Sequence, residues 1–387
     1  MTRSISILGA TGSIGASTLD LVRRNRAAWR VVALTANSSA DELAKLAMEF
    51  GAELAVVGDE SCLPSLRDAL GASDTASVGG AEALVEAAAR PADLTVAAIV
   101  GCAGLAPTMA AIEQGRTVAL ANKEALVSAG EVMTAAIARH GATLLPMDSE
   151  HNAIFQCLAG NSLDDVASIT LTASGGPLRE WSGERLRTAT PAQAVAHPNW
   201  DMGAKISVDS ATMMNKGLEF IEAYHLFPVG LDRLRIVVHP QSVIHSMVEY
   251  RDGSTLAQLG PSDMRVPIAS CLAWPGRMET PCERLDLARL GTLGFFAPDE
   301  GRFPATRLAR EALEEGGSSP AVLNAANEIA VAAFLAGQIA FTDICHIVEA
   351  TLERSNRPPL PADLAGVMQV DAAARALASE IAETRAR

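Results

Sequence analysis

Strand-like and helix-like segments alternate through residues 1–150, and this alternation restricts the possible folds more than any other feature of the chain. Continuous apolar runs typical of strands lie at 4–9, 30–36, 54–58, 94–100, 117–121 and 143–147, with helical segments between them. This arrangement predicts parallel βαβ units that are joined by right-handed crossovers. Because the runs are apolar throughout, we expect helices to cover both faces of the sheet.

The pattern changes after residue 148. We expect a helix at 149–159, a strand at 167–173, a long helix at 208–226, and strands at 235–238, 242–250 and 254–259, the last two joined by a hairpin turn. Residues 275–303 are rich in Pro and Gly, which predicts a linker. Amphipathic segments at 304–315, 320–337, 341–355 and 370–385 predict a helical bundle. The expected fold is α/β, with a Rossmann-like domain at 1–148, an α+β domain at 149–274, the linker, and a helical domain at 304–387.

Charge and composition exclude several classes of protein. The formal net charge of −14 argues against general binding to nucleic acid or to an anionic membrane. The longest apolar run, Leu94 to Ala106, is interrupted by two glycines and is too short to span a bilayer. Ser4 to Leu8 already predicts a buried strand, so we expect no signal peptide and, by default, a cytoplasmic location. The six cysteines are scattered without a CxxC pair, which predicts reduced thiols and no structural zinc.

A glycine motif follows the first predicted strand. Gly9, Gly12 and Gly15 open a helix, and glycines at this turn allow the backbone to approach a pyrophosphate closely. A glycine-rich turn without a ligand is the alternative reading, since the spacing is GxxGxxG and not GxGxxG. The second strand is followed by Asn37-Ser38-Ser39, with no carboxylate that would bind a ribose hydroxyl or repel a 2′-phosphate. The motif therefore predicts a dinucleotide, with a preference for NADP.

Two carboxylates follow the strand at 143–147. Asp148 and Glu150 lie where ligands gather in an open α/β sheet, and a D-x-E pair suits a hard divalent cation. Helix capping by Asp148 or Ser149 is the alternative.

The predicted helix at 208–226 shifts the balance toward the metal. Asn215 and Glu219 share one face of this helix, so Glu219 is a candidate third carboxylate. Ser210, near the expected helix start, together with Asn215 and Lys216, is a candidate phosphate site. The alternative is an ordinary surface pair between Lys216 and Glu219. Only four of the 31 basic residues are lysines, and Lys205 lies in the same stretch without an assigned role.

Two loops add further candidates. Ser174-Gly175-Gly176 ends a predicted strand and is typical of a small loop that contacts phosphate. His197-Pro-Asn-Trp200, with Gly203 after it, predicts a lid whose indole excludes water. A hydrogen bond that only orders the loop is the alternative role for His197.

Eight segments resemble the 1-deoxy-D-xylulose 5-phosphate reductoisomerase family across nearly the whole chain. They are GATGSIGASTLDLV, AIVGCAGLAPT, LANKEALV, MDSEHNAIFQ, TASGGP, HPNWDMGAKISVDSATMMNKGLE, HPQSVIHSMVEY and LNAANEIAVAAFL. The resemblance implies an enzyme of the non-mevalonate isoprenoid pathway. It would use NADPH and a divalent metal (Mg²⁺, Mn²⁺ or Co²⁺) to make 2-C-methyl-D-erythritol 4-phosphate. It also implies a homodimer.

The resemblance assigns roles at matching positions. The implied metal ligands are Asp148, Glu150 and Glu219. The implied contacts with the substrate phosphate are Ser174, Ser210, Asn215 and Lys216. Lys123, Ser149 and His197 would contact the sugar, and Trp200 would cover the closed site. The implied dinucleotide contacts are Gly9, Thr11, Gly12, Ser13, Ile14, Asn37, Ser38, Ser39, Asn122, Glu124 and Gly203. Some relatives carry Gly-Lys-Asn in place of Asn37-Ser38-Ser39, so this chain lacks a cation where the 2′-phosphate is expected.

Two other functions are compatible with a dinucleotide-binding fold. One is another NADP-dependent dehydrogenase of a phosphorylated carbonyl substrate, because Rossmann folds host many chemistries. Such an enzyme does not need three carboxylates. The other is a non-catalytic dinucleotide sensor, against which the joint presence of Asp148, Glu150, Lys216 and Glu219 argues.

Overall fold

The computed structural model describes residues 2–200 and 202–385. By its internal contacts the chain divides into two compact units. The first consists of Met1–Ala125, Met133–Asp148 and Met264–Cys282, and the second of Leu126–Val132, Ser149–Asp263 and Glu283–Arg387. In the part of the chain that the structure describes, no helix is both long enough and apolar enough to cross a bilayer. The four expected domain ranges stay predictions.

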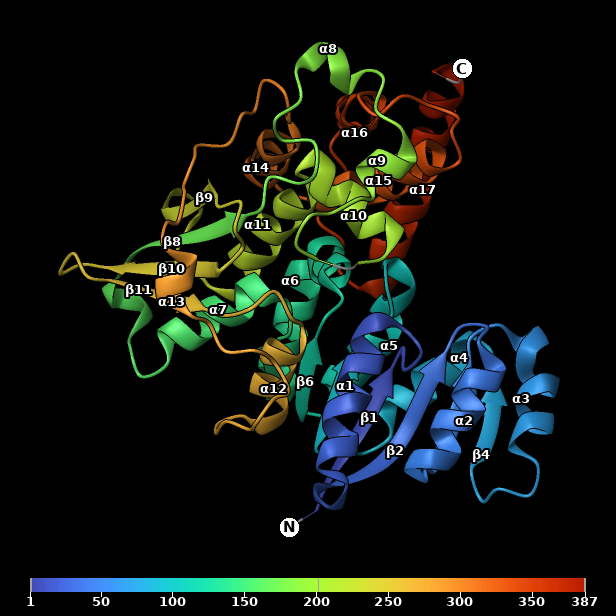
Figure 1. Ribbon diagram of the computed structural model, residues 1–387. Helices are drawn as coiled ribbons and strands as arrows, with labels where there is room; N and C mark the ends of the chain where they lie inside the picture. The colour runs from blue at the N-terminus through green and yellow to red at the C-terminus, as the bar shows by residue number, and fades with distance from the viewer. Residues whose placement is uncertain (1, 201, 386–387) are drawn as a thin grey trace. The chain divides into compact units, whose positions relative to one another are not determined.

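The first unit contains a seven-stranded sheet in which every pairing is parallel, in the order β4-β3-β2-β1-β5-β6-β7. Its strands are β1 (Arg3–Leu8), β2 (Trp29–Ala36), β3 (Leu54–Val57), β4 (Ala76–Gly79), β5 (Leu94–Ala97), β6 (Thr117–Leu120) and β7 (Thr143–Pro146). The order reverses between β1 and β5, which is the switch point where ligands bind in open α/β sheets. The expected α/β, Rossmann-like architecture is confirmed (Figure 1).

Six of these strands were expected, and β4 was not. β4 lies at the edge of the sheet, and its four residues Ala-Ser-Val-Gly are half-buried or exposed. An edge strand that buries little carries no continuous apolar run, so the sequence pattern does not reveal it.

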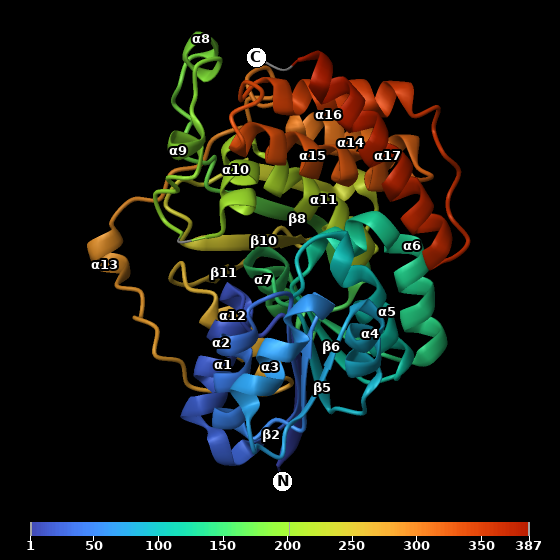
Figure 2. The same cartoon turned by 90° about the vertical axis from the view of Figure 1, so that its right-hand side faces the viewer.

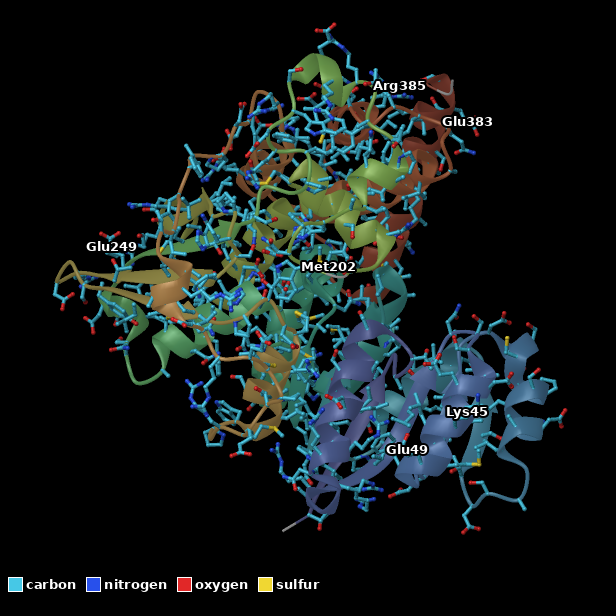
Figure 3. The ribbon with its side chains drawn as sticks, viewed as in Figure 1. Lys45, Glu49, Met202, Glu249, Glu383 and Arg385 are labelled. Carbon is cyan, nitrogen blue, oxygen red and sulfur yellow. The ribbon has the colours of Figure 1, made fainter. Side chains whose placement is uncertain are left out.

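Helices connect the strands of this unit. They are α1 (Ser13–Arg24), α2 (Ala40–Phe50), α3 (Leu63–Leu70), α4 (Ala81–Ala89), α5 (Leu105–Glu113) and α6 (Lys123–His140). The helix α12 (Arg265–Ala273), far along the chain, packs against α1, where Arg265 forms an ion pair of 3.2 Å with Asp20. Lys45 is exposed on α2 (Figure 3).

The second unit contains a four-stranded sheet in the order β11-β10-β8-β9. Its strands are β8 (Val166–Ala173), β9 (Leu234–Val238), β10 (Ile244–Tyr250) and β11 (Thr255–Leu259). β8 and β9 are parallel, whereas β10 runs antiparallel to β8 and β11. The expected hairpin is confirmed, because the Tyr250 N–H donates to Ser254 O at 2.8 Å and Gly253 has a φ of 85°. The remaining helices of this region are α7 (Ser149–Leu158), α8 (Gly183–Leu186), α9 (Pro191–Ala194) and α13 (Leu287–Leu290).

The single helix expected at 208–226 is wrong. The structure has two helices, α10 (Ala204–Thr212) and α11 (Met214–Leu226), separated by Met213 in the left-handed region with a φ of 67°. The Met214 N–H donates across the break to Thr212 Oγ1 at 3.3 Å. Residues in the left-handed region are usually Gly or Asn, so a methionine in the sequence does not predict such a break.

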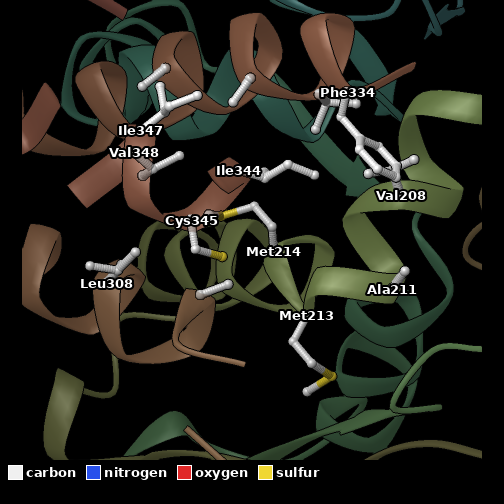
Figure 4. Close-up of a cluster of buried hydrophobic side chains, with 14 of the residues drawn as sticks. Val208, Ala211, Met213, Met214, Leu308, Phe334, Ile344, Cys345, Ile347 and Val348 are labelled. Carbon is white, nitrogen blue, oxygen red and sulfur yellow. The ribbon is translucent and has the colours of Figure 1, made fainter. Parts of the chain in front are cut away.

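Four C-terminal helices complete the second unit, namely α14 (Ala305–Glu315), α15 (Ser319–Leu335), α16 (Asp343–Arg354) and α17 (Leu364–Thr384). They lie together in Figure 2, and their apolar faces form one core with α10 and α11. Figure 4 shows Val208 of α10 in this core beside Phe334 of α15, with Ala211 further along α10. The start expected for the last helix was six residues late, because Asp363 caps α17 by accepting the Gly366 N–H at 2.8 Å.

Candidate active site

The glycine turn after β1 has the shape that a phosphate-binding loop requires. Gly9 has a φ of 88°, and a Cβ there would lie 2.7 Å from Ala98 O. A Cβ on Gly15 would lie 2.3 Å from Gly9 O, so only glycine lets α1 pack so closely on this turn. Gly12 caps α1 without a side-chain hydrogen bond. The first amides of α1, including those of Ser13 and Ile14, have no intrahelical acceptor and can bind a phosphate.

The segment that follows β2 is polar and exposed. Asn37, Ser38 and Ser39 are exposed, and the Asn37 carbonyl accepts the Asp59 N–H at 3.0 Å. The helix α2 begins directly afterwards with Asp41 and Glu42 in its first turn. Hydroxyls and amides are therefore the donors that this segment offers to a 2′-phosphate.

Lys123 and Asp148 meet in the first unit. Lys123 is the first residue of α6, is buried, and its Nζ lies 2.5 Å from Asp148 Oδ2. Asn122 caps the same helix by accepting the Ala125 N–H at 3.1 Å, and its Nδ2 donates to Gly101 O at 2.9 Å. Asn122 is thus fixed by the fold at the carboxyl end of β6. Glu124 follows Lys123 and is also buried.

A buried lysine joins two carboxylates in the second unit. Lys216 of α11 lies with its Nζ 2.8 Å from Glu150 Oε1 of α7 and also contacts Glu219 Oε2 one turn later. Burial alone would lower the pKa of Lys216, but the attraction of Glu150 and Glu219 outweighs it and holds the pKa above the ordinary value. Glu219 accepts a further hydrogen bond from Asn215 Nδ2, and Glu150 Oε2 accepts the Ser149 hydroxyl at 2.5 Å. The surface-pair reading of Lys216 and Glu219 is wrong, because both side chains are buried.

Three carboxylates have the spacing of a cation site. Asp148 is the residue that leads from β7 into α7, and one oxygen from each of Asp148, Glu150 and Glu219 lies within 4.8 Å of the others. Oxygen ligands that can approach one another in this way suit a hard divalent cation such as Mg²⁺. The donor set therefore fits the expected metal.

His197 is held by its neighbours as a hydrogen-bond donor. Its Nδ1 accepts the N–H groups of Asn199 at 3.2 Å and Trp200 at 3.0 Å, which places the ring proton on Nε2. Nε2 then donates to Ser174 Oγ at 2.9 Å. Burial lowers the pKa of His197, and the negative charge of Glu150 opposes this shift more weakly. The ring is therefore neutral near pH 7, and it connects the expected lid to the glycine loop.

Trp200 lies at the centre of the segment from His197 to Gly203 that is expected to form a lid. The Trp200 ring lies edge-on to the buried His245, with 6.0 Å between ring centroids. Asn199 Nδ2 donates to Pro240 O at 2.7 Å, and Gly203 caps α10. Asp201, within the expected lid, lies outside the described residues.

The sequence predicted that Ser210 lies near a helix start. The structure instead places Ser210 near the carboxyl end of α10. The helix start nearest to the candidate phosphate site is that of α11, which begins at Met214. Ser210 is nevertheless close to the glycine loop, because a Cβ on Gly176 would lie 2.4 Å from Ser210 O. The fold thus brings Ser210 to the glycine loop that contains Ser174.

Sequence reasoning missed two buried residues behind the carboxylates. His151 Nε2 lies 2.8 Å from the backbone oxygen of Glu219, and its Nδ1 lies 3.0 Å from Glu222 Oε2. These contacts fix the backbone of α11 at the residue that carries the carboxylate. Glu222, one turn after Glu219 on the same face of α11, was the available signal.

The parallel sheet with its glycine turn and the cluster of three carboxylates indicate an oxidoreductase that binds a nicotinamide dinucleotide and a divalent cation. Comparison with known families makes the assignment specific. Residues 5–130 match the model of 1-deoxy-D-xylulose 5-phosphate reductoisomerase, residues 144–227 match that of its C-terminal domain, and residues 259–377 match that of the DXP reductoisomerase C-terminal domain. The chain belongs to the 1-deoxy-D-xylulose 5-phosphate reductoisomerase family, as the sequence motifs indicated.

Individual relatives agree along the full length. The reductoisomerase of Zymomonas mobilis is 57% identical over 99% of this chain and 98% of its own, and that of Rhodospirillum centenum is 55% identical over 98% and 94%. A solved structure of the Zymomonas mobilis enzyme in complex with NADPH superposes with a TM-score of 0.94 over 99% of this chain and 100% of that one, at 55% identity. A DOX-P reductoisomerase in complex with NADPH, fosmidomycin and magnesium gives 0.93 at 44% identity, with 98% of each chain covered.

Proposed function

We propose that this chain uses the Lys216-centred carboxylate cluster to convert 1-deoxy-D-xylulose 5-phosphate into 2-C-methyl-D-erythritol 4-phosphate. NADPH is the hydride donor, and the product feeds isoprenoid synthesis. The observation that carries this function is the pairing of two features within one site. Three carboxylates lie within 4.8 Å of one another, and Lys216 holds two of them beside the start of α11.

The carboxylates of Asp148, Glu150 and Glu219 hold the divalent cation in this proposal. When bound, the cation polarises the substrate ketone and the neighbouring hydroxyl and stabilises negative charge that develops on oxygen. The chain's contribution is to fix the ligands. His151 anchors the backbone of Glu219, and Ser149 orients Glu150 through its hydroxyl.

The substrate phosphate binds to Ser174, Ser210, Asn215 and Lys216. Ser174 Oγ already accepts two hydrogen bonds, from His197 Nε2 and from the Gly176 N–H at 3.1 Å. Its own proton is therefore directed elsewhere, and a phosphate oxygen is a suitable acceptor. The first-turn amides of α11 and the Lys216 ammonium supply further donors and positive charge.

Lys123, Ser149 and His197 contact the sugar, and Trp200 covers it. His197 is neutral and donates from Nε2, so it binds a substrate oxygen without adding charge. Lys123 lies at Asp148 and can orient an oxygen bound there. Exclusion of water by the indole protects the aldehyde that the rearrangement produces until hydride reduces it.

The dinucleotide binds along the glycine turn of the first unit. The amides from Thr11 to Ile14, with Gly9 and Gly12, hold the pyrophosphate. Asn37, Ser38 and Ser39 receive the 2′-phosphate through hydroxyls and amides. Asn122, Glu124 and Gly203 complete the proposed contacts with NADPH.

We also propose a homodimer that forms through the sheet of the second unit. β11 is an edge strand whose residues are largely exposed, including Leu256 and Leu259 at 45% and 37%. An edge strand with exposed leucines is a template for pairing, and a second copy satisfies its free backbone groups. The cytoplasmic location is a proposal that rests on six free cysteines, four of them buried.

The test is NADPH oxidation on addition of 1-deoxy-D-xylulose 5-phosphate, with and without Mg²⁺. We expect turnover that a chelator abolishes and Mg²⁺ restores. Asp148→Asn should reduce kcat by more than about 100-fold, a transition-state loss of about 2.7 kcal/mol, with little change in thermal stability. Activity that persists in the chelator would contradict the metal assignment. An equal loss of stability and of turnover would favour a structural role for Asp148.

A further inference from the structure

A buried ion network connects α10 to the C-terminal helices. Asp209 is 1% exposed, and both of its carboxylate oxygens are used. Oδ2 lies 2.9 Å from Lys205 Nζ, one turn earlier on α10, and Oδ1 accepts a hydrogen bond of 2.8 Å from Asn327 Nδ2 on α15. Because Lys205 supplies the positive charge and Asn327 is neutral, the bond from Asn327 serves to fix the direction of the carboxylate.

Asn327 lowers the stability of the core that contains it. Its side chain is fully buried, and its Oδ1 has no hydrogen-bond partner among the residues that the structure describes. A buried amide oxygen without a partner is destabilising, because it has lost its hydrogen bond to water, whereas an apolar side chain of similar size has no such cost. The neighbouring core is apolar, with Val208, Leu323 and Val331 among its members. An asparagine at this position is therefore explained by its contact with Asp209 and not by packing.

The helix that this network holds contains Ser210. Ser210 follows Asp209 directly, and its backbone oxygen lies against Gly176 so closely that a Cβ there would be 2.4 Å away. α10 is therefore held between the glycine loop on one side and α15 on the other. Its position relative to the glycine loop determines the separation of Ser174 from Ser210, and the break at Met213 follows within three residues.

We propose that Lys205, Asp209 and Asn327 are positioning residues for the phosphate site. They fix the distance of α10 from the glycine loop, and at this distance Ser174 and Ser210 bind the same phosphate. The inference rests on the proposed function for the phosphate assignment. None of the three touches the phosphate. Without the bond from Asn327, we expect α10 to move in the apolar core, which changes the distance between Ser210 and the glycine loop.

The main test compares Asn327→Leu with Asn324→Leu. Asn324 lies one turn earlier on α15 and is equally buried, but it donates to Ser128 and Glu328 and not to α10. We measure KM, kcat, the melting temperature and, by calorimetry, the Kd for inorganic phosphate. Asn327→Leu should raise KM and the phosphate Kd together by about tenfold, equivalent to about 1.4 kcal/mol. kcat should change by less than about threefold, and the melting temperature should not fall. Asn324→Leu should leave the phosphate Kd unchanged.

A charge-conserving exchange provides the rescue. Asp209→Asn should weaken phosphate binding, and the double variant Asp209→Asn/Asn327→Asp should recover it, because one carboxylate and one amide again face each other beside Lys205. Unchanged phosphate affinity in Asn327→Leu, an equal effect of Asn324→Leu, or no recovery in the double variant would each overturn the proposal. A wild-type protein that binds phosphate without turning over substrate would refute the proposed function alone, since calorimetry needs no activity.

Discussion

Replacement of Lys216 by methionine tests the electrostatic centre of the site. Methionine keeps the length of the side chain and removes its charge, which leaves Glu150 and Glu219 in the interior without the ammonium that they share. Removing one partner of a buried ion pair costs about 3–5 kcal/mol. At about 2–4 °C per kcal/mol for a unit of this size, the melting temperature should fall by about 6–20 °C.

The matched control is Lys45→Met. Lys45 is exposed on α2, so the same chemical change should leave the melting temperature unaltered (Figure 3). Both variants are measured by thermal and urea unfolding after treatment with a chelator. Mg²⁺ should then stabilise Lys216→Met more than the wild type, because a divalent cation replaces the missing positive charge between the carboxylates.

The pH dependence of the difference follows from the direction of the Lys216 shift. The pKa of Lys216 is raised in the folded protein, so its contribution is fully present below the unfolded value of about 10.4 and is lost as the pH rises through the folded value. The difference in the free energy of unfolding between the wild type and Lys216→Met should therefore be constant from neutral pH to about pH 10 and decrease above it. A loss no larger than that of Lys45→Met would refute the reasoning.

Three further predictions concern other parts of the molecule. Since burial lowers the pKa of His197, the unfolded chain takes up a proton before the folded chain as the pH falls below about 6.5, and stability should decrease there; His197→Gln should remove this part of the pH dependence in urea titrations. Ser38→Lys should tighten NADPH about tenfold, or about 1.4 kcal/mol, and leave NADH unchanged in calorimetric titrations, and equal effects on both would exclude Ser38 from the 2′-phosphate site. Leu256→Lys on β11 should convert a dimer to a monomer in light scattering, and a dimer that persists would place the interface elsewhere.

Much of the fold follows from local patterns. Apart from the edge strand β4, the strands of the first sheet are largely buried, so each produces a continuous apolar run that marks its position within a few residues. The glycine turn is equally predictable from the sequence, because Gly9 and Gly15 occupy positions where a Cβ would collide with the backbone. These features depend on short stretches of chain, and short stretches are what a single sequence displays.

The features that escaped prediction depend on contacts between distant segments. The break at Met213 is set by how α10 and α11 pack in the core and not by a helix-breaking residue. The roles of Lys205 and Asp209 require Asn327, which lies 118 positions further along the chain. Likewise, the tautomer of His197 follows from backbone N–H groups of its own loop and from Ser174, 23 positions earlier. Residue types at the site were recognisable, but the pairings were not.

The burial of the lysines has a practical consequence for chemical labelling. Lys123 and Lys216 are buried, and Lys205 is 25% exposed and tied to Asp209, so their amines are shielded from reagents. Lys45, by contrast, is exposed on α2 of the first unit. An amine-reactive dye should therefore attach to a single lysine of the native protein. That gives the enzyme a built-in position for a fluorescent reporter that leaves every lysine of the active site untouched.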